Sequence, residues 1–267
     1  MRIGIDIRTL MDRRYSGVSN FTIELVNELL RQDTNNQYIL FYNAGQDVSD
    51  KIPAFNFGNA RMVATRYPNK IFNYVMQKIW HKPLLDQMLG VDVFFMPHIN
   101  FVALSKQGRK IITIHDLSFL RYYNFFSIRK NIWHKLIAIK KLLLQFDVIV
   151  AVSENTKRDL MELLNIAEEK IIVIYSGLNR NAIFDNDEAK IEFVKNKYGL
   201  PDSYFLFLGN LEPRKNIESV IVAYDKFVDT YPKYSDYGLV LAGDRGWRYD
   251  SIFSTLKRSR NKNKINL

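Results

Sequence analysis

The sequence predicts an α/β protein built on parallel β-sheets, and two observations support this fold class. Short apolar runs of strand length alternate with longer segments in which apolar residues recur at positions i, i+3 and i+4. Such alternation is typical of a doubly wound sheet with helices on both faces. The alternation stops near residue 180 and starts again after residue 201, so we expect two domains of this kind.

We expect the first domain to span residues 1–180. Its strands are expected at Ile3–Ile7, Tyr38–Tyr42, Val91–Met96, Ile111–Ile114, Val148–Val152 and Ile171–Tyr175, which are short and rich in β-branched residues. Its helices are expected at Asn20–Arg31, Lys70–Leu89, Arg129–Phe146 and Asn155–Leu164, where the apolar spacing is helical. Together these segments predict one α/β layer system.

Residues 181–201 are expected to be a linker, because Asn, Asp, Lys and Glu dominate there around one short helical stretch that Gly199 and Pro201 end. The second domain is expected to span residues 202–267. Its elements are strands at Tyr204–Leu208 and Gly238–Ala242, helices at Asn216–Thr230 and Tyr249–Lys257, and the start of a strand at Lys264–Leu267. Two or three parallel strands leave sheet edges open and bury little core. We therefore expect either a partner chain that completes this domain or a truncated chain.

The composition indicates a soluble globular protein. The chain has 267 residues, 38 Lys and Arg against 28 Asp and Glu for a formal charge of +10, and 47% hydrophobic residues. These values exclude a disordered or membrane-embedded protein. Without cysteine, neither disulfides nor Cys-ligated metal sites can form. The amino terminus lacks the apolar core of a secretory signal, and no apolar run approaches the roughly 20 residues of a membrane span, so we expect a cytoplasmic protein.

The positive charge is concentrated in residues 67–141, which hold 12 Lys or Arg and 3 acidic residues. Segments 70–82 and 128–141 mix cations with tryptophan and aliphatic residues, as do amphipathic helices that dock on anionic lipid. One interpretation is therefore a peripheral position at the inner face of a membrane. The alternative is an ordinary helix with a buried apolar face and a solvated lysine face. Nucleic acid is not an expected partner, because zinc-finger spacing and an aromatic RNA-binding motif are both absent.

A glycine turn follows the first predicted strand and leads into the first predicted helix. Gly17 near a helix start lets backbone N–H groups approach an anion, and the helix dipole favours negative charge there. The alternative is a simple helix cap formed by Ser19 or Asn20 with the downstream Glu24. The segment matches neither the dinucleotide fingerprint nor the P-loop pattern.

Polar residues also follow two later strands of the first domain. His115 and Asp116 come directly after Ile111–Ile114, at the edge where open α/β sheets bind ligands. His115 is thus a candidate site residue, and the alternative is a histidine that only caps a loop. Ser153 follows the next strand and is a candidate helix cap. The sequence contains no G-x-S-x-G elbow, so a serine hydrolase is not expected.

In the second domain, Gly209 follows a strand, and Arg214 and Lys215 precede a helix. Two cations at a helix start suit a diphosphate, because Arg supplies a planar fork and Lys a point charge. A solvated Arg–Lys pair is the alternative. The D-x-D segment at residues 185–187 could hold a divalent metal, but it lies in the predicted linker and we interpret it as a solvated turn.

Five motifs together resemble those of family 4 (group 1) glycosyltransferases, in the same order along nearly the whole chain. They are Ser16–Asn20, Thr113–Leu117, Val152–Leu160, Gly209–Asn216 and Leu241–Trp247. The resemblance implies the GT-B architecture, in which two Rossmann-like domains face a cleft. The first domain then binds mainly the acceptor, and the second, incomplete here, mainly the nucleotide-sugar donor.

The resemblance also implies roles for individual residues. Gly17 would lie near the donor phosphates, His115 in the sugar pocket as the catalytic candidate, and Gly209, Arg214 and Lys215 at the diphosphate. The implied reaction transfers a hexose, with mannose as one candidate, from a nucleoside-diphosphate sugar to a glycan or lipid-linked acceptor in cell-surface polysaccharide synthesis. It proceeds with retention at the anomeric carbon, without an essential metal or other cofactor, through electrostatic stabilisation of the leaving group.

The sequence departs from the family pattern in two respects. Asn210 stands where some members carry an arginine after the glycine. The E-x7-E region and the glycine-rich loop that bind the nucleotide ribose and the sugar have no counterpart and would lie beyond Leu267. The alternative function is therefore a noncatalytic glycosyltransferase remnant that binds an acceptor, a membrane or a partner without turnover.

Overall fold

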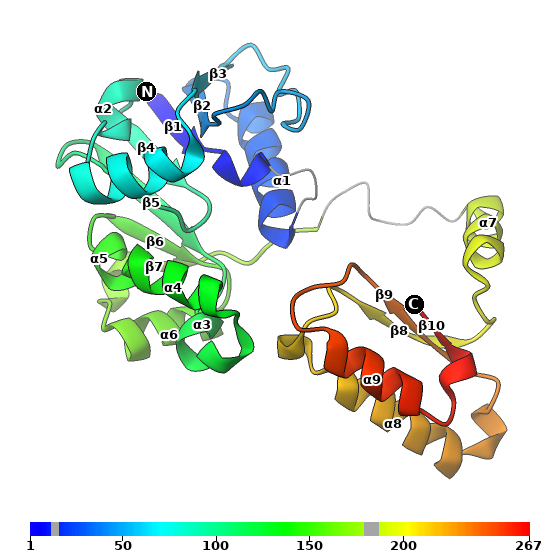
Figure 1. Cartoon of the computed structure of the whole chain (residues 1–267). Coiled ribbons are helices and arrows are strands. Elements are labelled where there is room, and N and C mark those ends of the chain that lie inside the picture. The colour runs from blue at the N-terminus through cyan, green and yellow to red at the C-terminus, as the bar shows by residue number, and fades with distance from the viewer. Residues whose placement is uncertain (12–15, 179–186) are drawn as a thin grey trace. The chain divides into compact units, whose positions relative to one another are not determined.

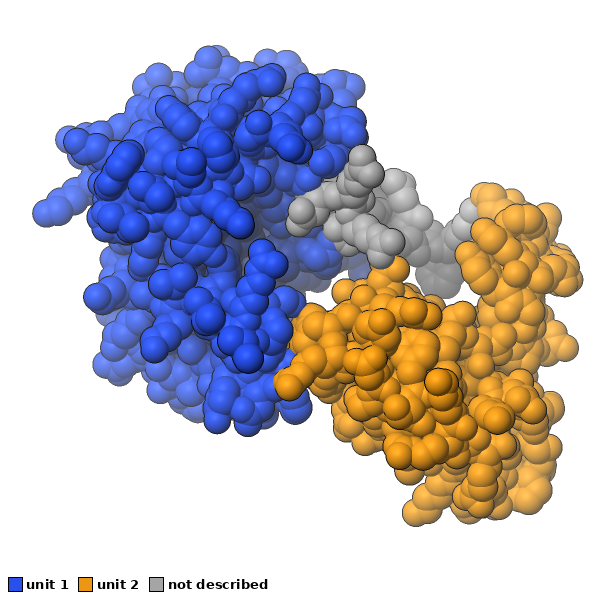
Figure 2. All heavy atoms as spheres, in the orientation of Figure 1, with its two compact units in different colours: residues 1–179 blue, residues 180–267 orange. Residues whose placement is uncertain are grey.

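The computed structural model describes residues 1–11, 16–178 and 187–267. The chain divides into two compact units, residues 1–179 and residues 180–267, which Figure 2 distinguishes by colour.

Unit 1 is built on a seven-stranded sheet in the order β3-β2-β1-β4-β5-β6-β7, and every neighbouring pair is parallel. The strands are β1 (Arg2–Asp6), β2 (Gln37–Asn43), β3 (Ala60–Thr65), β4 (Val93–Met96), β5 (Arg109–Ile114), β6 (Val148–Ala151) and β7 (Ile171–Val173). Six of them fall where apolar runs predict strands. The sequence does not predict β3, because this edge strand exposes Arg61 and Met62 and has no continuous apolar run.

Helices cover unit 1 on both faces of the sheet (Figure 1). They are α1 (Gly17–Gln32), a π-type helix at Ile71–Trp80, α2 (Leu85–Leu89), α3 (Ser118–Arg121), α4 (Ile128–Ile137), α5 (Ile139–Leu143) and α6 (Glu154–Leu164). The core accordingly forms two clusters. Ile39 and Phe41 of β2 belong to one cluster, whereas Tyr38 and Leu40 belong to the other. Burial on both faces explains why the strands are almost continuously apolar.

The prediction of single helices at residues 70–89 and 129–146 was wrong. The first helix ends at Trp80, His81 adopts a left-handed conformation with φ 51°, and Pro83 follows, which cannot donate a helical hydrogen bond. The second break lies at Ala138, which has φ 49° and separates α4 from α5. Alanine is the best helix former, so no residue in the sequence marks this break.

Unit 2 contains a three-stranded parallel sheet in the order β10-β9-β8. Its elements are α7 (Glu188–Tyr198), β8 (Tyr204–Leu208), α8 (Ile217–Thr230), β9 (Gly238–Ala242), α9 (Asp250–Arg258) and β10 (Ile265–Asn266). Figure 1 shows α8 and α9 on the same face of this sheet, where they share an apolar cluster with β9. The side chains of Leu206 and Leu208 are 57% and 78% exposed.

The segment expected to be a linker contains α7. Asp187 caps this helix by accepting hydrogen bonds from the backbone N–H groups of Ala189 and Lys190. The other two residues of the D-x-D segment, Asp185 and Asn186, lie outside the described residues.

Candidate functional site

The carboxyl edge of the unit 1 sheet gathers polar residues from several strands. Asp6 is the last residue of β1, His98 lies two residues after β4, and His115 follows β5 directly. Because β1, β4 and β5 are neighbouring parallel strands, these side chains come together at one edge. Open α/β sheets bind their ligands at such an edge.

His115 is held in one orientation by contacts on two sides. Its Nε2 atom lies 2.9 Å from the backbone oxygen of Pro97, and its ring packs edge-on against Phe21 of α1 with 4.8 Å between ring centroids. A carbonyl oxygen can only accept, so Nε2 must carry the proton and Nδ1 the lone pair. Burial lowers the pKa of His115, an effect that the Pro97 carbonyl and the Asp116 carboxylate only partly offset. The ring is therefore neutral near pH 7, with Nδ1 able to accept a hydrogen bond.

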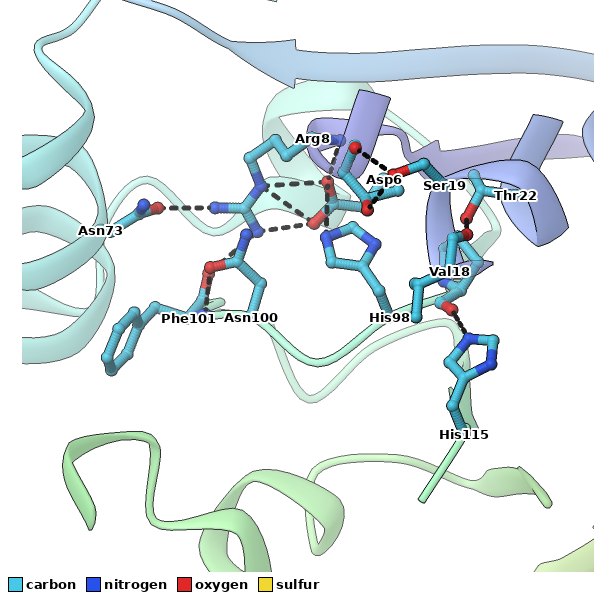
Figure 3. Close-up of polar contacts among 12 residues, drawn as sticks. Asp6, Arg8, Val18, Ser19, Thr22, Asn73, His98, Asn100, Phe101 and His115 are labelled. Carbon is cyan, nitrogen blue, oxygen red and sulfur yellow. Dashed lines mark hydrogen bonds and ion pairs between the residues drawn. The ribbon is translucent and has the colours of Figure 1, made fainter. Parts of the chain in front are cut away.

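A buried ion pair lies at the end of β1 (Figure 3). Arg8 donates to both carboxylate oxygens of Asp6, at distances of 2.6 to 3.0 Å, and both side chains are almost fully buried. Its remaining donors reach the side-chain oxygen of Asn73 and the backbone oxygen of Phe101, each at 2.9 Å. Burial alone would raise the pKa of Asp6, but the charge and hydrogen bonds of Arg8 lower it overall.

His98 lies beside this ion pair without a hydrogen bond to either ring nitrogen from the described residues. Its Nε2 atom is 4.0 Å from Oδ1 of Asp6, and the residue is 7% exposed. Burial lowers the pKa of His98 to about 4, although Asp6 opposes this shift. The ring is therefore neutral at pH 7, and packing alone orients it.

The first turn of α1 lies at the same edge. The helix begins at Gly17, and its cap is Ser16, whose hydroxyl accepts from the N–H of Ser19. The alternative named Ser19 or Asn20 as the cap, and this assignment was wrong, because Ser19 is already in the first turn, where its buried hydroxyl donates to the Thr9 carbonyl. A Cβ atom at Gly17 would meet no atom within 4 Å among the described residues.

The start of α6 also contacts this edge. Ser153 caps the helix by accepting from the N–H of Thr156, which confirms the sequence prediction. The Thr156 hydroxyl donates in turn to the backbone oxygen of His115 at 3.3 Å. His115 is thus linked to the residue that follows β4, to α1 and to α6.

In unit 2, two glycines bring the ends of β8 and β9 together. Gly209 has φ 149° and Gly243 has φ 155°, and a Cβ atom on Gly243 would lie 2.1 Å from the oxygen of Gly209. Only glycine fits at Gly243, because its backbone conformation and this close approach both exclude a side chain. The loop after Gly209 is held further by the N–H of Leu211, which donates to the oxygen of Asp244.

The two predicted diphosphate ligands differ in their surroundings. Arg214 donates through Nε to the carboxylate of Glu212 at 3.1 Å, and the same carboxylate lies 3.0 Å from the terminal Nη2 atom of the guanidinium. Glu212 is buried, so this ion pair fixes the guanidinium. Lys215 is exposed at the end of the short helix Pro213–Lys215, just before α8.

Three of the residues at the unit 1 edge were not predicted: Asp6, Arg8 and His98. His98 comes shortly after the predicted strand Val91–Met96, much as His115 follows Ile111–Ile114, so the rule that singles out His115 could have found it. Asp6 lies inside the predicted strand Ile3–Ile7, and that rule does not reach it. Arg8 follows this predicted strand, but its role depends on Asn73 and Phe101, which lie 65 and 93 residues away in the sequence.

The helices of residues 67–141, the basic window of the sequence, expose apolar side chains. Ile128, Ile132 and Leu136 of α4 recur every four residues and are 81%, 54% and 41% exposed. Trp80 and Ile79 at the end of the π-type helix are also exposed. The stripe formed by Ile128, Ile132 and Leu136 of α4 therefore does not lie in the core, whereas the apolar face of an ordinary amphipathic helix would.

In the described part of the chain, no group of three or more His, Asp or Glu residues could hold a metal ion, and no helix has the length and apolar character to cross a membrane.

The model of Glycosyltransferase Family 4 matches residues 15–181 of this chain. Among curated relatives, the serotype-specific mannosyltransferase WbdA of Escherichia coli is 32% identical over 151 residues, which are 53% of this chain and 18% of that protein. The O-antigen chain mannosyltransferase B of Escherichia coli is 24% identical over 259 residues, which are 91% of this chain and 64% of that protein. The chain thus spans less than two thirds of the length of each of these relatives.

Solved glycosyltransferases share the fold. A glycosyltransferase from Rickettsia africae superposes with a TM-score of 0.62 at 20% identity, covering 99% of this chain and 66% of that one. HepE from Anabaena, in complex with UDP and glucose, gives a TM-score of 0.60 at 15% identity, covering 99% of this chain and 67% of that one. The fold of the chain is therefore of the GT-B type, as the sequence predicts.

Proposed function

Since the chain belongs to glycosyltransferase family 4, we propose that it transfers a hexose from a nucleoside-diphosphate sugar to a glycan or lipid-linked acceptor in cell-surface polysaccharide synthesis. The observation that carries this proposal is the family match across residues 15–181, which includes Gly17 and His115 at the carboxyl edge of the unit 1 sheet. Mannose is the proposed sugar, because two relatives bear the name mannosyltransferase.

The proposed reaction retains the configuration of the anomeric carbon. The bond from this carbon to the diphosphate oxygen breaks, the bond to the acceptor oxygen forms on the same face, and the acceptor hydroxyl passes its proton to the departing diphosphate oxygen. Arg214 and Lys215 are proposed to stabilise the charge of the diphosphate, and the backbone at Gly17, in the first turn of α1, to bind a phosphate. His115 is proposed to accept a hydrogen bond from a sugar hydroxyl through Nδ1.

Titration of the chain with UDP and GDP by calorimetry, at two salt concentrations, tests the diphosphate site. We expect saturable binding, with affinity reduced about tenfold to hundredfold by Arg214→Ala, since hydrogen bonds to charged groups contribute about 1.5–3 kcal/mol. Lys215→Ala should weaken binding less, because an exposed ammonium is a hydrated point charge.

Two further variants control this measurement. Arg214→Lys keeps the positive charge beside Glu212. Any loss of nucleotide affinity in this variant therefore measures the contribution of the planar guanidinium group alone. Lys257→Ala removes an exposed cation from α9 of the same unit and should leave the affinity unchanged. Affinities that are equal in all four variants would place the diphosphate elsewhere. No binding by the unmodified chain would favour the noncatalytic alternative.

We propose in addition that the basic window docks on anionic lipid. The exposed stripe Ile128, Ile132 and Leu136 lies on a helix that also exposes Arg129 and Lys135. Apolar side chains that enter the headgroup region beside cations give binding that depends on both membrane charge and buried apolar area.

Sedimentation with vesicles tests this docking. We expect the chain to bind vesicles that contain phosphatidylglycerol and to bind pure phosphatidylcholine weakly. The double change Ile128→Gln and Ile132→Gln should reduce the bound fraction several-fold, whereas Leu163→Gln, at an exposed leucine of α6, should not. Equal binding of both variants would mean that α4 does not face the lipid.

A further inference from the structure

The segment between β4 and residue 101 carries the contact that fixes the His115 ring. Pro97 supplies the backbone oxygen that pairs with Nε2 of His115, and His98 is the next residue. His98 makes no hydrogen bond with the described residues through its ring. The Pro97 carbonyl is therefore held by the paired strand β4 on one side, and on the other it depends on what holds the rest of this segment.

Arg8 holds the far end of the segment. Its guanidinium joins three parts of unit 1: the carboxylate of Asp6 at the end of β1, the Asn73 amide on the π-type helix, and the backbone oxygen of Phe101. Figure 3 shows these contacts radiating from one side chain, with the His98 ring packed beside Asp6. A lysine in this place could not make them all, because it lacks the planar fork.

We infer that Arg8 is a positioning residue for His115, acting through the 97–101 segment. With Arg8 in place, the Pro97 carbonyl accepts from Nε2–H, and Nδ1 is left as a hydrogen-bond acceptor. Without it, the segment loses its anchor at Phe101, and the ring is free to adopt the other tautomer, in which Nδ1 carries the proton and cannot accept. This inference builds on the role proposed above for His115.

The tautomer of His115 can be measured without any ligand. The chain has 4 histidines, so a long-range proton–nitrogen spectrum of protein labelled with ¹⁵N-histidine contains four ring systems, and His115→Gln identifies one of them. In the unmodified chain we expect His115 to be a single, neutral Nε2–H tautomer. In Arg8→Lys and Arg8→Met we expect the Nδ1–H form to appear as a substantial fraction.

The controls separate positioning from folding. Arg121→Met removes a surface ion pair with Asp159 from the same unit and should leave the His115 signals unchanged. Arg8→Lys keeps a positive charge beside Asp6, so it provides a folded variant if Arg8→Met fails to fold. A single Nε2–H tautomer in folded Arg8→Lys would overturn the inference. Unaltered UDP-sugar affinity in His115→Gln would instead contradict the proposed role of His115 while leaving the tautomer result intact.

Discussion

Strands β1 and β8 hold equivalent places in the two units but have different surroundings. Each is the first strand of its parallel sheet along the chain, and each is followed by a short 3-10 helix and then an α-helix. β1 is paired with β2 on one side and β4 on the other, whereas β8 pairs with β9 alone among the described strands. Ile5 of β1 is fully buried, whereas Leu206 of β8 is 57% exposed.

The composition of β8 does not match its exposure. Its sequence, Tyr-Phe-Leu-Phe-Leu, is a continuous apolar run of the kind found in strands that are buried on both faces. An exposed apolar strand with a free edge is a template for pairing with another chain. β8 therefore has the sequence of a central strand, but among the described residues only unit 1 surrounds its first strand fully.

Removing one apolar side chain from each strand should change the stability of the two units very differently. Ile5→Ala should reduce the free energy of unfolding of unit 1 by about 2–5 kcal/mol, because it leaves a cavity in a closed core. Leu206→Ala should change the stability of unit 2 by no more than about 0.5 kcal/mol, as is usual at exposed positions.

Denaturant unfolding of each variant, followed by circular dichroism, measures both changes. In a Trp247→Phe background the remaining tryptophans, Trp80 and Trp133, both lie in unit 1, so fluorescence then reports that unit alone. A loss above 2 kcal/mol for Leu206→Ala would mean that β8 is covered in solution, and the contrast between the strands would disappear.

The sequence predicts the strands of both units well because apolar runs and their spacing determine them locally. It fails where tertiary contacts decide. The edge strand β3 is half polar, and the break at Ala138 occurs between two buried isoleucines with no local signal. The break near Pro83 was available from the sequence, but the helical spacing on either side of it concealed it.

The candidate site likewise contains residues that the sequence could place and residues that it could not. His115 and Ser153 could be placed at the sheet edge because they follow strands, and parallel strands end together. The Asp6–Arg8 pair could not be recognised, because its meaning depends on Phe101, which only the folded chain brings near. The roles of Gly209, Arg214 and Lys215 stay predictions that nucleotide titration must test.

Stability at low pH should also differ between the two units. All four histidines lie in unit 1. Burial lowers the pKa of His98 to about 4, below the value of about 6.5 expected in an unfolded chain. The unfolded state then binds more protons, so stability is present above pH 6.5 and is lost as the pH falls toward 4. The loss for this residue is about 3 kcal/mol.

Unfolding of His98→Gln at several pH values measures this contribution. Between pH 6.5 and 4.5 we expect a smaller slope of the unit 1 free energy than in the unmodified chain, by up to about 1.4 kcal/mol per pH unit. His81→Asn, at an exposed histidine, should keep the original slope. An unchanged slope in His98→Gln would show that the ring is already protonated or accessible in the folded chain.

The smallest change in stability is expected when one glycine of each unit is replaced. Gly17→Ala adds a methyl group at the first position of a helix, where it meets no atom of the described residues within 4 Å, so unit 1 should gain a few tenths to about 1 kcal/mol. Gly243→Ala should destabilise unit 2 instead, because the added Cβ overlaps the Gly209 oxygen. Thermal unfolding measures both changes.

If Gly17 lies near the donor phosphates, the methyl group of Gly17→Ala should weaken UDP binding while stability rises. A Gly17→Ala variant that gains stability and binds UDP with full affinity would show that this helix start is a capped terminus and not a phosphate site.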